Sequence, residues 1–522
     1  MKLESLLEGI NVESLTGSLE TDINSIHYYS GKVEPGGLFV AIRGYRVDGH
    51  DYIEDAIKRG AQVVVSEKDL DVPPYVTLIR VPDTRLTLSR LAANFYGQPS
   101  KGICLIGVTG TNGKTTTAYL AEAILNARGY STGVIGTINY RFLGNTYTSL
   151  VTTPESVDLQ RILREMADGG VTHVVLEVSS HALALHRVAD CYFDIGVFTN
   201  LSRDHLDYHK DMDSYYQCKK SLFLTLLNRG PKKDRAVAVI NCDDPKGRSI
   251  YDEMDVTGLS VGLSDGCMIR AHDLKVTQEG IHGIISTPEG EFSFRSPLTG
   301  LHNAHNILNA VGIGISLGIP LKQIKAGVEG LKGVPGRMER IGNRLGLHIF
   351  VDYAHTPDAL ERVLTTLKSI ASNRIITVFG CGGERDREKR PLMGSAAGRL
   401  SDLVIVTADN PRNEPVDQIL SDIVQGTKSV QPYRYEPEIL LKGVERPGYV
   451  VEADRRSAIR IGIHAARRGD IVLIAGKGHE TYQICGEHKI PFDDREEARR
   501  VLKEIEANQS WIDLKGSNSS PL

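Results

Sequence analysis

One short segment combines the residue types that phosphate binding requires. Residues 110–116 read GTNGKTT and lie between an apolar run and a helix-forming run. The two glycines let backbone N–H groups approach phosphate oxygens, and the following helix N-terminus adds partial positive charge. Lys114 can reach the β and γ phosphates, and Thr115 can offer its hydroxyl to Mg²⁺. Because position 108 is Val, the general G-x-x-x-x-G-K-[ST] pattern is not met, and the segment predicts a variant phosphate loop for ATP.

Further polar side chains follow apolar runs of the same region. Glu177 closes the run VVLEV, and NLSRDHLDYH (200–209), which contains His205, follows the next run. Open α/β folds bind ligands at the carboxyl ends of their parallel strands. Mg²⁺ prefers oxygen ligands, so Glu177 is a candidate magnesium ligand, whereas His205 indicates a second metal. Either residue alone is more often a surface or capping group, but the two together near a phosphate loop favour metal binding.

Apolar strands alternate with helices along most of the chain, which is typical of an α/β protein. The 522 residues suggest about three domains at roughly 100–200 residues each. We predict a smaller N-terminal α/β domain over 1–98, a central doubly wound parallel sheet with the phosphate loop over 99–335, and a C-terminal Rossmann-like domain over 336–508. The polar residues 509–522 predict a disordered tail. Turn-rich short strands over 256–297 predict an antiparallel patch.

The composition excludes several classes of protein. The 65 acidic and 61 basic residues give a net charge of -4, so the whole surface is not suited to nucleic acid or an anionic membrane. The seven scattered cysteines form no C-x-x-C pair, which argues against a disulfide framework or a thiolate zinc site. No signal peptide and no membrane-spanning run is visible. We expect a cytoplasmic protein that is a monomer.

The motifs, taken in order, resemble those of the Mur ligase family. GTNGKTT, EVSSH, SRDH, DNPR and GKGHE follow one another as in that family, and the resemblance covers nearly the whole chain. The folylpolyglutamate synthetases have a similar ATP loop. Both families use ATP to convert a carboxylate into an acyl phosphate, which an amine then attacks. The resemblance implies an ATP-dependent ligase of peptidoglycan synthesis with Mg²⁺ as its cofactor.

The resemblance also assigns residues to the ATP site. YYQCKKSLF (215–223) is similar to the family pattern Y-x-x-x-K-x-S-L-F, which aligns Lys219 with a carbamylated lysine and leaves Lys220 as the alternative. The implied catalytic residues are Lys114, Glu177, His205 and Lys219, and the implied metal ligands are Thr115, Glu177, His205 and Lys219. The implied ATP-binding residues are Gly110, Thr111, Asn112, Gly113, Lys114, Thr115, Thr116, Asn303, Arg337 and Asp352.

Two further ligands are implied by the same resemblance. The positions that match binding of UDP-N-acetylmuramoyl-L-alanyl-D-glutamate are Ser30, Thr152, Thr153, Ser179 and Arg187. The family usually shows D-S-R where this chain reads Tyr29, Ser30 and Gly31, so the uridine contacts depart from the family pattern. The positions that match the amine site are Arg385, Asp409, Asn410, Arg412, Gly476 and Glu480.

The tetrapeptide DNPR (409–412) indicates which amine is added. It is similar to that of the diaminopimelate-adding members of the family, whereas lysine-adding members usually differ at its last position. Meso-diaminopimelate has a second carboxylate that Arg412 can bind through paired hydrogen bonds, and lysine would leave this arginine unpaired. We therefore expect addition of meso-diaminopimelate. The alternatives are addition of L-lysine, a folylpolyglutamate-type ligase, and a P-loop nucleotide switch that makes no product.

Overall fold

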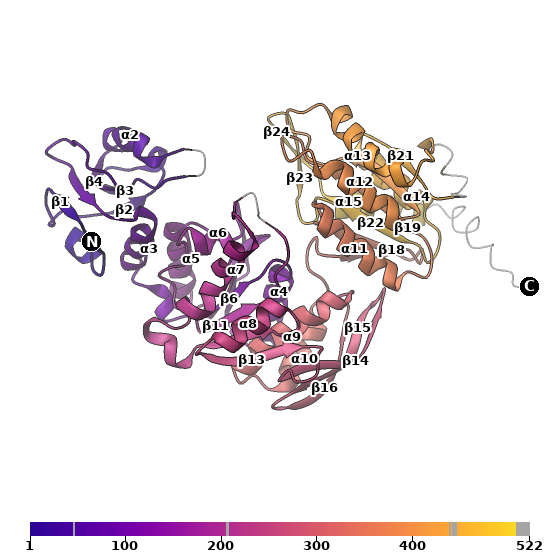
Figure 1. Ribbon diagram of the computed structural model, residues 1–522, viewed down its shortest axis with the longest axis horizontal. Helices are drawn as coiled ribbons and strands as arrows, with labels where there is room; N and C mark the ends of the chain where they lie inside the picture. Colours follow the sequence, from indigo (N-terminus) through magenta and orange to yellow (C-terminus); the bar gives the residue numbers. More distant parts are fainter. Residues whose placement is uncertain (45–46, 205–207, 438–439, 441–445, 508–522) are drawn as a thin grey trace, which may run out of the picture. The chain divides into compact units, whose positions relative to one another are not determined.

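The computed structural model describes residues 1–44, 47–204, 208–437, 440 and 446–507. These described residues form two compact units. The first comprises the described residues of 1–273 with 284–294 and 304–330, and the second comprises 274–283, 295–303 and the described residues from 331 onward. Each unit contains mostly parallel sheets with helices packed on them (Figure 1), which confirms the predicted α/β class. The three domain boundaries remain predictions, and His205 and the tail at 509–522 lie outside the described residues.

A small five-stranded sheet begins the first unit, in the order β1-β5-β4-β3-β2. All its neighbouring strands are parallel except β1 and β5. The strands are β1 (Ser14–Thr16), β2 (Ser25–His27), β3 (Gly37–Val40), β4 (Ala61–Ser66) and β5 (Thr77–Arg80). The helices are α1 (Leu3–Leu6), η1 (Ser30–Lys32), η2 (Gly49–Tyr52), α2 (Ile53–Lys58), α3 (Thr84–Phe95) and η3 (Pro99–Lys101). The inner strands β3 and β4 are buried at nearly every position, as expected where helices cover a parallel sheet.

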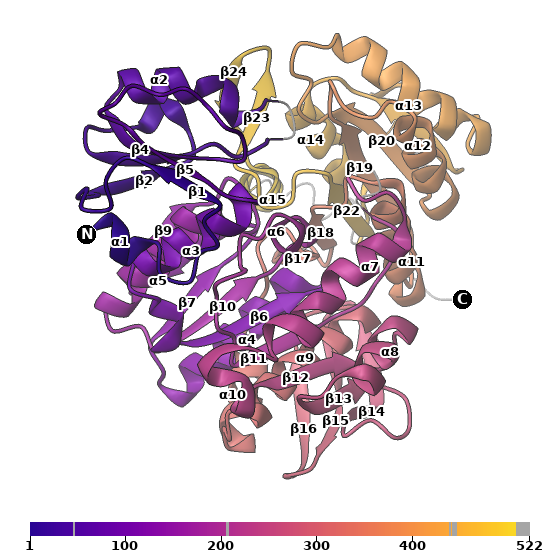
Figure 2. The same cartoon turned by 60° about the vertical axis from the view of Figure 1, so that its left-hand side comes forward.

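The largest sheet has eleven strands in the order β16-β15-β14-β13-β12-β11-β6-β10-β7-β8-β9. From β14 to β7 neighbouring strands are parallel, and β8 and β9 continue the sheet as antiparallel strands; Figure 2 shows the parallel strands side by side. The strands are β6 (Cys104–Thr109), β7 (Thr132–Ile135), β8 (Asn139–Phe142), β9 (Asn145–Thr148), β10 (His173–Glu177), β11 (Ile195–Phe198), β12 (Val237–Asn241), β13 (Thr257–Gly262), β14 (Ile269–Thr277), β15 (Gly280–Thr287) and β16 (Gly290–Ser296).

Helices connect most of these parallel strands and cover the sheet. They are α4 (Lys114–Arg128), α5 (Ser156–Asp168), α6 (Ser180–Ala184), α7 (Met212–Ser221), η4 (Leu222–Leu226), η5 (Gly230–Arg235), α8 (Pro245–Glu253), α9 (Leu301–Ser316) and α10 (Leu321–Gly330). The apolar side chains of β6, β10, β11 and β12 form one core with α5 and the segment that follows α7. This packing fixes where each parallel strand ends, and the candidate site residues follow those ends.

The predicted antiparallel patch at 256–297 is wrong in its first part. β13 pairs in parallel with β12, and β14 pairs in parallel with β13. The turn-rich sequence suggested hairpins, but the connection before β13 contains the helix α8. A helical crossover returns the chain to the same edge of a sheet and so joins parallel strands.

The second unit contains a six-stranded sheet in the order β17-β18-β22-β19-β20-β21, parallel except for the β17–β18 pair. Its strands are β17 (Glu339–Ile341), β18 (His348–Asp352), β19 (Ile375–Cys381), β20 (Leu403–Ala408), β21 (Gly448–Val451) and β22 (Ile471–Ala475), with β23 (Tyr482–Cys485) and β24 (His488–Pro491) as a separate hairpin. The helices are α11 (Pro357–Ile370), α12 (Lys389–Leu400), α13 (Val416–Val430), α14 (Arg455–Ala465) and α15 (Asp494–Ala507). Among the helices of the described ranges, none has the length and apolar character to cross a lipid bilayer.

Candidate functional site

The predicted phosphate loop lies between β6 and α4, at the carboxyl end of a central strand. Gly110 has a φ of 142° and Gly113 a φ of 85°, which are conformations that favour glycine. A Cβ at Gly110 would lie 1.9 Å from Oγ1 of Thr199. That hydroxyl donates to the carbonyl of Asn112 at 2.6 Å and fixes the loop against the end of β11. The three threonines of the loop itself are all buried: Thr111, Thr115 and Thr116.

Two lysine ammonium groups meet at one carbonyl oxygen of this loop. Nζ of Lys114 donates to the Gly110 carbonyl at 2.9 Å, and Nζ of Lys219 donates to the same oxygen at 2.8 Å. Lys219 is buried on α7, and this burial, together with the charge of Lys114, lowers its pKa well below the usual value. Lys220, by contrast, forms an ion pair with the exposed Glu253. The positive charge of Lys114, beside the backbone N–H groups of the loop, makes the loop suitable for an anion such as phosphate.

Glu177 lies at the end of β10 and is 2% exposed. Its Oε2 accepts hydrogen bonds from the hydroxyls of Thr115 and Thr137, both at 2.9 Å, and its Oε1 accepts one from the Thr137 amide at 3.0 Å. A Cβ at Gly136 would lie 2.2 Å from Oε1, so the backbone passes directly against this carboxylate. The carboxylate and the Thr115 hydroxyl are hard oxygen donors side by side, and such a pair fits a Mg²⁺ ion that also binds phosphate.

Within the ranges that the structure describes, no three His, Cys, Asp or Glu side chains are placed to hold one metal ion. His205 lies outside those ranges, so its part in metal binding stays a prediction. Mg²⁺ commonly keeps several water ligands and binds one or two carboxylates, so the donor set at Glu177 remains suitable.

Three of the residues predicted for the muramoyl dipeptide gather beside Glu177. Oγ1 of Thr153 donates to the Glu177 carbonyl at 2.7 Å and accepts from the Ser179 amide at 3.1 Å. The hydroxyls of Thr152 and Thr137 are 3.1 Å apart. The side chain of Ser179 also accepts from the backbone at the start of α6, so it caps that helix. The structure therefore joins the predicted dipeptide residues to the predicted metal ligand through short hydrogen bonds.

The other two dipeptide residues have partners of their own. Arg187 donates from Nη1 to the carbonyl of Thr153 at 3.1 Å and from Nε to Glu155 at 3.2 Å. Its guanidinium is thus held at the Thr153 segment. Ser30 is buried at the start of η1, and its hydrogen bond lowers the pKa of Asp55. No contact in the described residues joins Ser30 to Arg187 or Thr153.

Three predicted nucleotide residues belong to the second unit. Asp352 ends β18, and its carboxylate accepts from two backbone amides at 2.7 and 2.8 Å. Burial raises the pKa of Asp352, while the nearby charge of Arg337 and the two amides oppose this rise. The Arg337 guanidinium lies 4.9 Å from the ring centroid of Tyr353. Asn303, on α9, donates to the Thr299 carbonyl at 2.7 Å. Arg337 and Asp352 are thus brought together, and Asn303 occupies a different element.

The predicted amine site contains an interlocked set of polar side chains at the carboxyl ends of β20 and β22. Nδ2 of Asn410 donates to Oε2 of Glu480 at 3.0 Å. Lys477 is completely buried and donates from Nζ to Oδ1 of Asn410 and to Oε2 of Glu480, each at 3.1 Å. The same ammonium lies 3.5 Å from Asp409, and a Cβ at Gly476 would lie 3.2 Å from that carboxylate. One buried cation thus compensates two carboxylates and holds them in place.

Arg412 lies beside this set in a left-handed conformation, with a φ of 53°. Its backbone N–H donates to the carbonyl of Ile484 in β23 at 3.0 Å, and its Nη1 donates to the carbonyl of Gly383 at 2.8 Å. A Cβ at Gly383 would lie 1.9 Å from the carbonyl of Pro411, so only glycine allows the two loops to approach. The guanidinium is therefore anchored on one side, whereas Arg385 is an exposed residue on the loop after β19.

Sequence reasoning missed two residues of these clusters. Thr137 follows β7 in the stretch GTINY, and its position after an apolar strand was the available signal. Lys477 lies within the motif GKGHE, of which only Gly476 and Glu480 were predicted to act. Before the strand order was known, the Thr137 hydroxyl could not be assigned to Glu177, and the Lys477 ammonium could not be assigned to the carboxylates of the amine site.

Comparisons with known proteins identify the family. The model of the Mur ligase family catalytic domain matches residues 22–96, that of the Mur ligase middle domain matches 108–314, and that of the Mur ligase glutamate ligase domain matches 336–478. These matches cover most of the chain and contain both polar clusters except Glu480, which follows the last matched residue by two positions. The chain belongs to the Mur ligase family.

Relatives of similar length support this assignment. A protein from Geobacter metallireducens named UDP-N-acetylmuramoyl-L-alanyl-D-glutamate--2,6-diaminopimelate ligase is 50% identical over 505 residues, covering 97% of this chain and 99% of its own. A solved structure of a ligase of that name superposes with a TM-score of 0.68 at 33% identity, covering 97% of this chain and 99% of its own. The MurF ligase from Thermotoga maritima in complex with ADP shares the fold, with a TM-score of 0.60 at 19% identity, covering 93% of this chain and 98% of its own.

Replacing Thr137 tests whether its hydroxyl orients Glu177. Thr137→Val should lower turnover by about tenfold, because a buried carboxylate loses a hydrogen bond worth ~1–3 kcal/mol. Thr137→Ser keeps the hydroxyl and should remain within about twofold of wild type. The turnover of each variant is measured by steady-state phosphate release from ATP, and a thermal melt of each variant checks that it is folded. Equal activity of the two variants would show that Glu177 does not need this donor.

Proposed function

We propose that this chain is an ATP-dependent amide ligase that joins meso-2,6-diaminopimelate to UDP-N-acetylmuramoyl-L-alanyl-D-glutamate in peptidoglycan synthesis. The observation that carries the proposal is the amine-site cluster, in a chain 50% identical over 505 residues to a ligase of that name. Asp409 and Glu480 suit an ammonium group, and the anchored guanidinium of Arg412 suits a carboxylate. An amino acid that has both groups at its far end matches this arrangement, and lysine lacks the carboxylate.

Carboxylate activation is the first step. The side-chain carboxylate of D-glutamate attacks the γ-phosphorus of ATP, the bond to the bridging oxygen breaks, and an acyl phosphate and ADP form. Lys114 compensates the negative charge of the transferred phosphoryl group, since its ammonium lies in the phosphate loop. Thr115 and Glu177 would hold Mg²⁺, which would supply further positive charge at the phosphates. Positioning and charge compensation account for this step, as in other phosphoryl transfers.

Amide formation is the second step. An unprotonated amine of diaminopimelate attacks the acyl carbon, the carbon–nitrogen bond forms, and inorganic phosphate leaves. Glu480 binds the distal ammonium and Arg412 the distal carboxylate, so the near amine is directed at the acyl carbon. Lys477 keeps Glu480 and Asn410 in fixed positions through its two hydrogen bonds. Its ammonium also compensates part of the negative charge of the neighbouring carboxylates of Asp409 and Glu480.

The other predicted contacts belong to the same proposal. Those proposed for the nucleotide are Gly110, Thr111, Asn112, Gly113, Thr116, Asn303, Arg337 and Asp352. Those proposed for the muramoyl dipeptide are Ser30, Thr152, Thr153, Ser179 and Arg187, and Arg385 is added at the amine site. We place the enzyme in the cytoplasm as a monomer, where its seven free thiols suit a reducing compartment.

Carbamylation of Lys219 can be tested against its neighbour. Lys219 is buried beside the phosphate loop, whereas Lys220 is ion-paired with Glu253, so a carbamate is expected on the first lysine alone. Wild-type protein in carbon-13 bicarbonate should show a carbamate resonance by NMR. The resonance should vanish in Lys219→Ala and persist in Lys220→Ala. Its loss in Lys220→Ala instead would move the modification to that residue.

Amine selectivity tests the proposed reaction itself. With ATP and the UDP-linked dipeptide, meso-diaminopimelate should stimulate phosphate release and L-lysine should not. Arg412→Ala should raise the KM for diaminopimelate by about 10- to 100-fold, because a charge-assisted pair of hydrogen bonds is lost. Arg399→Ala, an exposed arginine on α12, serves as the control and should change nothing. Equal stimulation by lysine would make the chain a lysine-adding ligase, and release indifferent to any amine would contradict the ligase proposal.

A further inference from the structure

A fully buried ion pair lies just behind the amine site. Arg455 is the first residue of α14, and Asp494 is the first residue of α15; their side chains are 0% exposed. Nε of Arg455 donates a hydrogen bond to Oδ1 of Asp494, and Nη2 donates one to Oδ2, both at 2.7 Å. A buried ion pair often adds little net stability, because both charges lose their hydration. The role of this pair is therefore better judged from the other groups that it contacts than from its contribution to stability.

The same guanidinium also binds the ends of two strands. Nη1 of Arg455 donates to the carbonyl of Ala408 at 3.3 Å, and Nη2 donates to the carbonyl of Ala475 at 2.9 Å. Ala408 is the last residue of β20, and Ala475 is the last residue of β22. These strands are not neighbours in the sheet, since β19 lies between them. One side chain thus bridges two strand ends that no backbone ladder joins directly.

Both bonded carbonyls directly precede the amine-site segments. Asp409 follows Ala408, and Gly476 follows Ala475. Burial lowers the pKa of Arg455, but Asp494, and beyond it Asp409 and Glu480, raise the pKa overall. The charge of Arg455 therefore also acts on the carboxylates of Asp409 and Glu480. The ammonium of Lys477 contacts the same two carboxylates.

We propose that Arg455, oriented by Asp494, is a positioning residue of the amine site. It sets the distance between the segment 409–412 and the segment 476–480, and so aligns the groups that bind diaminopimelate. The inference rests on the proposed function, because it concerns the binding of that amine. Arg455 itself lies behind the strand ends and acts through them.

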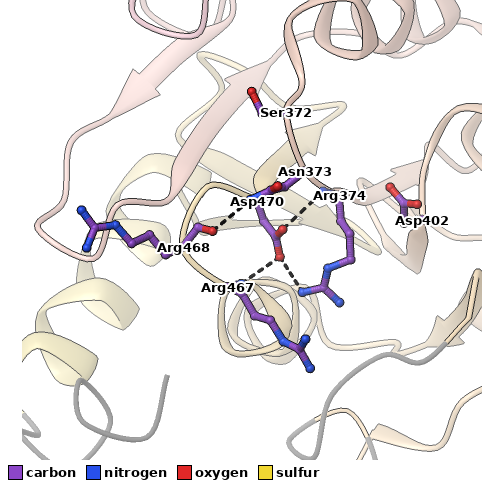
Figure 3. A pocket seen from close by; sticks show the side chains of 7 residues that line it. All are labelled: Ser372, Asn373, Arg374, Asp402, Arg467, Arg468 and Asp470. Atoms are coloured by element: carbon purple, nitrogen blue, oxygen red, sulfur yellow. Dashed lines mark hydrogen bonds and ion pairs between the residues drawn. The ribbon is translucent and has the colours of Figure 1, made fainter. Parts of the chain in front are cut away.

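A second Arg–Asp pair, at the amino ends of strands of the same sheet, provides a control. Arg374 precedes β19 and Asp470 precedes β22, so this pair joins the amino ends of two strands. Nη2 of Arg374 donates a hydrogen bond to the Asp470 carboxylate at 2.5 Å and another to the Ala465 carbonyl at 3.2 Å. Asp470 is buried. Figure 3 shows Asp470 between Arg374 and the turn at Arg467. These residues line a pocket of about 400 Å³. Like the Arg455 pair, the Arg374 pair joins an arginine to a buried aspartate and to a backbone carbonyl, although its guanidinium side chain is 22% exposed. It lies at the amino ends of the strands, away from the amine site.

The test compares Arg455→Lys with Arg374→Lys in the full-length enzyme. The KM values for diaminopimelate, ATP and the UDP-linked dipeptide are measured by phosphate release, together with the melting temperature. Arg455→Lys should raise the KM for diaminopimelate by about tenfold and leave the other two within about twofold, because lysine cannot bond both carbonyls and the carboxylate at once. Arg374→Lys should leave all three KM values within about twofold, even where it lowers the melting temperature equally.

Other outcomes separate this inference from the proposed function. An unchanged KM for diaminopimelate in Arg455→Lys, or an equal rise in all three KM values, would overturn the positioning role. Absence of diaminopimelate-dependent release by the wild type would overturn the proposed function instead. If Arg455→Lys does not fold, Asp494→Asn decides the question: it keeps the guanidinium but removes the charge that orients it. That variant should show the same selective rise, and its absence would contradict the positioning role.

Discussion

Burial of charged groups at the carboxyl ends of parallel strands is the constraint on which both clusters depend. Glu177 ends β10, Asp352 ends β18, and Asp409 follows β20, and all three are almost removed from water. An uncompensated charge in such a place costs several kcal/mol or changes its protonation. Each carboxylate therefore has its own partners, and these partners fix where its oxygens lie. The geometry that the chemistry needs is a consequence of this compensation.

The partners differ in kind, and the difference suits the two halves of the reaction. Glu177 is held by neutral hydroxyl and amide donors of Thr115 and Thr137, which fix its oxygens without adding a positive charge, so a cation can bind there. The carboxylates of the amine site share the ammonium of Lys477, which limits their net charge to about one unit. A site of that charge suits one ammonium group, and the guanidinium of Arg412 beside it suits a carboxylate. Such a division matches an amino acid with two charged ends.

The fold class followed from the alternation of apolar strands and helices, and the family from motifs at the strand ends. Periodicity failed where turns were frequent, because residues 256–262 read as a hairpin strand but follow the crossover helix α8. Lys219 and Lys220 look alike in the sequence; only the packing of α7 places one beside Gly110 and the other beside Glu253. Neighbour relations of this kind are set by tertiary packing, which local sequence does not encode.

Residues that act through others were the hardest to predict. Thr137, Lys477 and Arg455 are ordinary members of a loop, a motif and a helix start, and each matters because of a partner far away in the chain, as Asn410 is for Lys477. The bonds of Arg455 join residues 47 and 20 positions away. A pattern read along the chain identifies the groups that bind ligands by their chemistry, whereas the groups that orient them become visible only when the strand order is known.

The most direct test of the proposed ligase chemistry follows one oxygen atom. UDP-N-acetylmuramoyl-L-alanyl-D-glutamate labelled with oxygen-18 in the D-glutamate side-chain carboxylate is incubated with ATP, Mg²⁺ and meso-diaminopimelate. The released phosphate is then analysed by mass spectrometry. The mechanism predicts one labelled oxygen in each phosphate, because the carboxylate oxygen bonds phosphorus in the acyl phosphate and leaves with it. Phosphate without label would contradict the mechanism, since ATP would then be cleaved without activating the carboxylate.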